Sequence, residues 1–128
     1  MKKVFISQGM RGKTEDEIQR ERKDLENLAH SAINEEIQII DSLITEEPPK
    51  NINQSLWYLG ESLKIMACAD VVIFAKDWEK YRGCRIEYQA TTDYGIEKII
   101  PIEGDKIDDF KQYTIERGNN SDNQKNFR

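Results

Sequence analysis

Val71-Val72-Ile73-Phe74 is a continuous run of four apolar residues. Such a run is typical of a strand that is buried on both faces of a parallel sheet. Before it, residues 55–67 repeat leucines at the spacing of an amphipathic helix, capped near the start of that segment. After it, a polar loop over residues 75–83 leads to a second helical repeat over residues 86–94. The run therefore predicts a strand between two helices.

Further apolar runs of strand length lie at residues 4–6, 37–41 and 99–102. A helix with a capping box at Thr14 to Glu17 separates the first two runs, and a last helix is expected from about Asp105 to Gly118. The alternation predicts an α/β, Rossmann-like or flavodoxin-like three-layer sandwich with four or five parallel strands in the order 2-1-3-4. Ligands of such sheets bind where the strand order reverses. We therefore expect a crevice between the loops at residues 7–12 and 75–83.

The chain has 128 residues, which suits one domain over residues 1–118 with a disordered tail at 119–128. No stretch approaches the roughly 20 apolar residues that span a bilayer, so no membrane partner is expected. A short apolar start and two cysteines without metal or disulfide spacing favour a cytoplasmic protein with no metal and no cofactor. The net charge of −5 argues against binding to nucleic acid.

The first candidate site is the loop Ser7-Gln8-Gly9-Met10-Arg11-Gly12, which lies between a strand and a helix. Backbone N–H groups at such a position, together with a forked guanidinium, suit phosphate oxygens. The alternative interpretation is a tight turn, because the loop lacks the pattern of a dinucleotide-binding motif or a P-loop. Both interpretations remain open from the sequence.

The second candidate site combines Asp77 with the segment from Gly83 to Glu87. Glu87 falls in the first turns of a helix and on the side that faces the sheet, so its carboxylate can point into the crevice. Alternatively, Glu87 is a solvated residue that favours the helix dipole. Asp41 at the end of the second strand can reach a ribose hydroxyl, and Trp78 can stack on a base or cover the core.

Four segments in this order resemble a known family: residues 6–13, Ile40-Asp41-Ser42, residues 69–74 and residues 82–87. The chain from about Lys2 to Ile102 is similar to domain of unknown function 4406, within the nucleoside 2-deoxyribosyltransferase superfamily. The transferases typically carry an aromatic residue in the first loop. The Arg-Gly pair found here looks more like that of the deoxynucleoside 5′-monophosphate N-hydrolases.

The resemblance implies that Glu87 is a nucleophile that attacks the sugar of a nucleotide, and that Asp77 donates or orients a proton for the leaving base. It also implies that Arg11 and the backbone of Gly9 and Gly12 anchor the 5′-phosphate, in a homo-oligomer. Two alternatives stay open. In the first alternative, the chain is a non-catalytic module that senses or sequesters a signalling nucleotide. In the second, it is an NAD-cleaving domain of the Toll/interleukin-receptor type.

Overall fold

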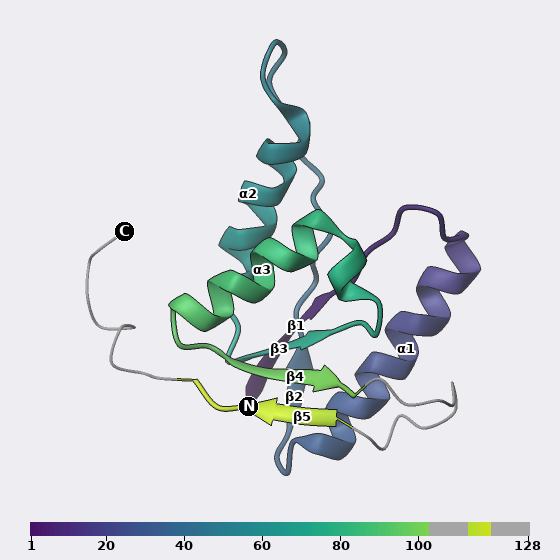
Figure 1. Ribbon diagram of the computed structural model, residues 1–128, viewed down its shortest axis with the longest axis vertical. Coiled ribbons are helices and arrows are strands. Elements are labelled where there is room, and N and C mark those ends of the chain that lie inside the picture. Colours follow the sequence, from purple (N-terminus) through teal and green to yellow (C-terminus); the bar gives the residue numbers. More distant parts are fainter. Residues whose placement is uncertain (103–112, 119–128) are drawn as a thin grey trace.

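The computed structural model describes residues 1–102 and 113–118. This part of the chain has an α/β fold with three α-helices and one mixed sheet (Figure 1). In chain order, the elements are β1 (Lys2–Ser7), α1 (Glu15–Ala32), β2 (Ile37–Ile39), α2 (Gln54–Met66), β3 (Val71–Phe74), the short 3₁₀ helix η1 (Trp78–Lys80), α3 (Arg82–Asp93), β4 (Glu97–Pro101) and β5 (Tyr113–Glu116). None of these helices combines the length and the apolar character that crossing a bilayer requires.

The sheet has five strands in the order β2-β1-β3-β4-β5. The first four strands of the chain are parallel, and β5 pairs with β4 in the antiparallel direction. Because β1 has β2 on one side and β3 on the other, the strand order reverses beside β1. Ser7 at the end of β1 pairs with Phe74 at the end of β3, so the loops that follow these two strands leave the sheet together.

Strand β5 shows that the helix expected from Asp105 to Gly118 is wrong at its carboxyl end. Tyr113 and Ile115 pack against the core, whereas Thr114 between them is exposed, which is the period of two of a strand. The open edge of β4 offers backbone hydrogen bonds to this segment, and local helical spacing cannot reveal such a partner. Residues 103–112 and the tail at 119–128 lie outside the described residues.

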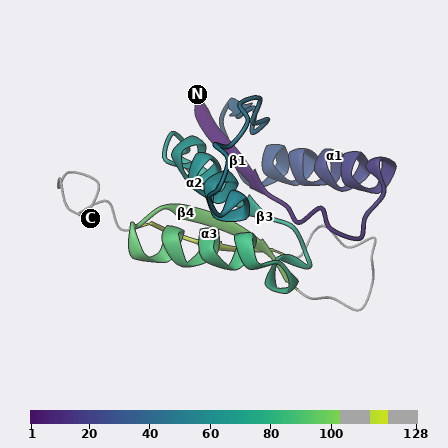
Figure 2. The same ribbon diagram turned by 90° about the horizontal axis from the view of Figure 1, so that it is seen from above.

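Two apolar layers cover the two faces of the sheet, and α1 lies on the opposite side from α2 and α3 (Figure 2). Successive side chains of β3 alternate between these layers. Val71 and Ile73 pack in the cluster that includes residues of α1, and Val72 and Phe74 pack with residues of α2 and α3. All four side chains are buried, which confirms the prediction of a strand that is covered on both faces.

The three helices begin in different ways. The predicted capping box of α1 is confirmed, because Thr14 and Glu17 exchange side-chain to backbone hydrogen bonds. Asn53 caps α2 by accepting from the backbone N–H of Leu56 at 3.0 Å. Tyr81 stands at the N-cap of α3 and makes no side-chain capping bond, and the first turn of α3 holds no acidic residue. The backbone N–H groups at the start of α3 therefore have no capping side chain.

Candidate functional site

Glu87 is a buried carboxylate that three elements hold in place. Its side chain comes from α3 and keeps only 6% of its surface exposed. The hydroxyl of Ser7, at the end of β1, donates to Glu87 Oε1 at 2.8 Å, and the hydroxyl of Ser62, on α2, donates to Oε2 at 2.7 Å. The two carboxylate oxygens are thus fixed by donors from two separate segments.

Burial raises the pKa of Glu87 above its ordinary value of 4.5, because the charged form loses contact with water. The hydroxyls of Ser62 and Ser7 oppose this rise, since both donate to the ionised carboxylate. Each carboxylate oxygen has a second lone pair, so both hydrogen bonds can persist while one oxygen approaches an electrophile. Glu87 is therefore a positioned carboxylate with little water around it.

A pocket of about 780 Å³ opens beside Glu87. Its walls come from the first loop, α1, the loop after β2, α2, and the segment from η1 into α3. Among the described residues, Glu87 is the only acidic residue that lines it. The lining includes six of the residues expected from the sequence: Gln8, Gly9, Met10, Arg11, Gly83 and Glu87. The structure thus brings the first loop and the start of α3 together around one cavity.

The first loop is held by Tyr81. A Cβ atom added at Gly9 would lie 2.1 Å from Cγ of the Tyr81 ring, so the ring occupies the space that any larger residue needs. The Tyr81 hydroxyl donates to the carbonyl of Arg11 at 2.9 Å. Gly12 has a φ of 81° and follows Arg11 in a turn that the N–H of Lys13 closes onto the carbonyl of Met10. The packing at position 9 and the backbone conformation at position 12 therefore both favour glycine.

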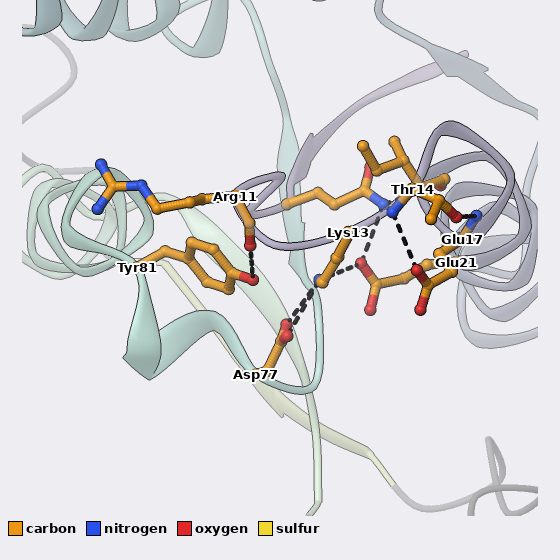
Figure 3. A network of polar contacts seen from close by, with 9 residues as sticks. Arg11, Lys13, Thr14, Glu17, Glu21, Asp77 and Tyr81 are labelled. Carbon is orange, nitrogen blue, oxygen red and sulfur yellow. Dashed lines mark hydrogen bonds and ion pairs between the residues drawn. The ribbon is translucent and has the colours of Figure 1, made fainter.

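A network of ion pairs joins this loop to the loop after β3 (Figure 3). Lys13 Nζ lies 2.8 Å from Glu21 Oε1 and 3.0 Å from Asp77 Oδ2. Burial alone would lower the pKa of Lys13, but its hydrogen bonds and the two carboxylate charges outweigh burial and raise that pKa. The Arg11 guanidinium points away from this network. Lys13 thus clamps the two loops while Arg11 stays available to the pocket.

The structure places Asp77 in the Lys13 clamp, outside the residues that line the pocket. Trp78 stacks on Tyr88 with ring centroids 4.3 Å apart and belongs to the core beside Phe74. Asp41 accepts from the backbone N–H of Leu43 at 2.9 Å and is exposed. These three expected site residues, and Gly12, lie apart from the pocket lining.

Two further polar side chains, Ser62 and Gln8, line the pocket, and only Gln8 was predicted from the sequence. Ser62 was missed, although it occupies a position on the same helical stripe as Leu59 and Met66, where an apolar residue would be ordinary. Gln8 donates to the carbonyl of Ile18 and to Glu21. Over residues 1–102 and 113–118, Gln8 Oε1 is the buried side-chain atom that has no hydrogen-bond partner.

Cys84 lies next to this pocket but does not have the properties of a nucleophile. Burial raises the pKa of the thiol to about 11, against the smaller lowering effect of the Ser7 hydroxyl. The thiol is therefore protonated at neutral pH, whereas nucleophilic cysteines act as thiolates. Of these two lining residues, Glu87 is therefore the better candidate for a nucleophile.

Comparison with family models, with curated proteins and with solved structures finds no significant match for this chain.

Proposed function

We propose that this protein cleaves the N-glycosidic bond of a nucleoside or deoxynucleoside 5′-monophosphate, as the resemblance to the nucleoside 2-deoxyribosyltransferase superfamily implies. The observation that carries the proposal is Glu87, a buried carboxylate that accepts from two serine hydroxyls at the wall of a pocket that Arg11 also lines. A carboxylate in such a place suits covalent catalysis at an anomeric carbon.

In the proposed reaction, an oxygen of Glu87 attacks C1′ of the sugar. The bond from C1′ to the base breaks, and the base leaves with that electron pair and takes up a proton. Water then attacks C1′ of the glycosyl ester and releases a proton to the solvent, which balances the proton taken up by the base. The ester bond to Glu87 breaks, which restores the carboxylate and retains the configuration. A nucleobase in place of water would make the same step a transfer. The buried hydroxyls keep the carboxylate oriented throughout.

The first loop supplies the binding energy in this proposal. Arg11 and the backbone N–H group of Gly9 would hold the 5′-phosphate. Binding of the phosphate at a distance from C1′ can orient the sugar for attack. Loss of Arg11 should therefore lower turnover as well as affinity.

The direct experiment is incubation of the wild-type protein with a panel of nucleosides and nucleoside 5′-monophosphates, followed by chromatography for free base. A second base added to the reaction distinguishes transfer from hydrolysis. Base release from a monophosphate supports the proposal. Intact recovery of every nucleotide, together with a rise in melting temperature on binding, would instead support a non-catalytic nucleotide-binding module. That second candidate is favoured by one observation: the described lining holds a single carboxylate.

We propose that Asp77 acts as a positioning residue through Lys13. The carboxylate of Asp77 pairs with Lys13 and lies outside the pocket lining, so it does not face the leaving base directly. Asp77→Asn is expected to lower turnover by about tenfold, as for the loss of one charge-assisted hydrogen bond. The decrease should be the same for bases that leave readily and for bases that leave slowly.

Lys13→Met provides the matched comparison for Asp77. If the two residues act as one clamp, the double variant should lose little more than either single variant. A decrease that grows steeply with the basicity of the leaving base would show that Asp77 supplies a proton, and it would contradict the positioning role.

We further propose that the protein is a homo-oligomer that pairs through its α2 arm, defined as residues 43–59. Helix α2 carries large apolar side chains over 13 residues, yet only Met66 at its end is buried. In Figure 1, the arm extends away from the sheet. Leu43 and Leu56 are 72% and 63% exposed. A helix of this length is marginal without packing, and a second copy presents the same apolar surface in a symmetric pair.

The oligomer proposal predicts that Leu56→Glu converts the protein to a monomer, because an ionised group cannot be buried in an apolar interface without a partner. Light scattering after size-exclusion chromatography measures this directly. Ile86→Glu, at an exposed position on α3, is the matched control and should leave the mass unchanged. A monomeric wild-type protein at high concentration would contradict the pairing.

The exposed Cys68 and the buried Cys84 are both free thiols, which is consistent with the cytoplasmic location that belongs to the same proposal.

A further inference from the structure

The pocket beside Glu87 is lined by an excess of basic side chains. One comes from the first loop and one from α1, and three surround the start of α3: Arg11, Arg22, Lys80, Arg82 and Arg85. The whole chain has a net charge of −5, so this concentration does not follow from composition. A cavity with one carboxylate and five basic residues is a site for an anion of high charge.

Three of these basic side chains have no polar partner of their own. Arg85 donates to the carbonyl of Glu79, and Arg22 lies 3.9 Å from Glu26. In contrast, the side chains of Arg11, Lys80 and Arg82 make no hydrogen bond or ion pair within the described part of the chain. Unpaired like charges around one cavity repel one another, and a bound anion relieves that repulsion.

Tyr81 fixes how these side chains are arranged. It stands between Lys80 and Arg82 in the sequence, its ring packs on Gly9, and its hydroxyl binds the carbonyl of Arg11. Lys80 and Arg82 are therefore held next to the loop that carries Arg11. The start of α3, which has no side-chain cap, adds backbone N–H groups at the same place.

A single phosphate ester carries a charge of about −1.5 to −2 at neutral pH, which Arg11 and the loop N–H groups can balance. Lys80 and Arg82 then have no anion of their own. We infer that the pocket binds a nucleotide with two linked phosphoryl groups, with one group on the Arg11 loop and the other between Lys80 and Arg82. This inference rests on the proposed nucleotide site, but it does not require cleavage. A nucleoside 5′-diphosphate and a dinucleotide joined by a pyrophosphate share this chemistry.

The test uses Glu87→Gln so that ligands stay intact, and calorimetric titration at one fixed salt concentration. The mono- and diphosphates of the four common nucleosides are compared base by base, with NAD as the dinucleotide. The diphosphate of at least one base should bind about tenfold more tightly than its monophosphate, as for one added charge-assisted contact. Affinity for NAD close to that of ADP would identify an internal pyrophosphate as the preferred group, and weaker binding of NAD would identify a terminal one.

The variant Lys80→Ala/Arg82→Ala should lose most of the preference for diphosphates. Lys23→Ala, which removes an exposed charge from α1 away from the pocket, is the matched control and should keep that preference. Equal affinity for mono- and diphosphates, or a preference that survives the double substitution, would overturn the inference. Diphosphate preference without base release by the wild-type protein would overturn cleavage and leave the inference standing. Base release by the wild-type protein without a preference for diphosphates would support cleavage and overturn the inference of a diphosphate site.

Discussion

Glu87→Gln is expected to abolish release of the base while leaving the protein folded. The substitution keeps the shape of the side chain and replaces the ionised oxygen with an amide, which is not a nucleophile at neutral pH. Loss of a covalent nucleophile generally lowers turnover by at least about a thousandfold. The measurement is the initial rate of base release under saturating nucleotide. Persistent release at the wild-type rate would remove Glu87 from the mechanism.

The same substitution is expected to raise stability. Because burial raises the pKa of Glu87 when the chain is folded, the folded protein keeps a proton that the unfolded chain has already released. The contribution of this group to stability is therefore greatest below its ordinary pKa of 4.5, and it falls as the pH rises through the folded value. At neutral pH, an ionised carboxylate is buried at a cost that the amide avoids. Glutamine can still accept from one serine and donate to the other.

We expect Glu87→Gln to add about 1 kcal/mol at pH 7, or roughly 4 °C in melting temperature. The gain should shrink as the pH is lowered toward 4.5. Glu79→Gln is the matched control, since Glu79 is exposed and does not line the pocket. A destabilised Glu87→Gln protein would show that the serine hydroxyls stabilise the ionised carboxylate more than burial disfavours it.

Local patterns predicted the parts of this fold that depend on neighbours in the sequence. The buried run Val71–Phe74 and the capping box at Thr14 are such cases, because strand burial and helix starts follow from residue types a few positions apart. The segment at Tyr113–Glu116 was predicted as a helix, since its partner β4 lies elsewhere in the chain. The periodicity of a segment cannot show that the open edge of β4 will pair with it.

The residues of the candidate site also divide into those with a local sequence signal and those that depend on distant partners. Glu87 and the first loop were found because each has a local signal: a carboxylate at a helix start, and glycines after a strand. The Asp77 side chain is held by Lys13, which is 64 residues away in the sequence. The hydrogen-bond partner of Ser62 is Glu87, which is 25 residues away in the sequence. Such side-chain pairs arise from packing, so a single sequence leaves them unspecified.

Gly9→Ala is expected to be among the most damaging small substitutions in the described part of the chain. The new methyl group would meet Cγ and both Cδ atoms of the Tyr81 ring at 2.1 to 2.3 Å, close to the ring's attachment point. The ring cannot swing aside without losing the hydrogen bond between its hydroxyl and Arg11. Overpacking of this kind costs about 1–3 kcal/mol, and the broken hydrogen bond adds about 1 kcal/mol. We therefore expect a loss of about 2–4 kcal/mol in denaturant unfolding.

Two other glycines separate this steric effect from backbone effects. Gly12→Ala meets no atom within 4 Å and should cost only about 1 kcal/mol, because alanine is strained at a φ of 81°. Gly60→Ala lies in α2 with open space around it and should stabilise the helix by about 0.5–1 kcal/mol. In the Gly9→Ala protein, Tyr81→Ala should cost far less than it does in the wild type, because removal of the ring also removes the clash with the new methyl group. Additive losses from these two substitutions would show that Gly9 is required for a reason other than the ring.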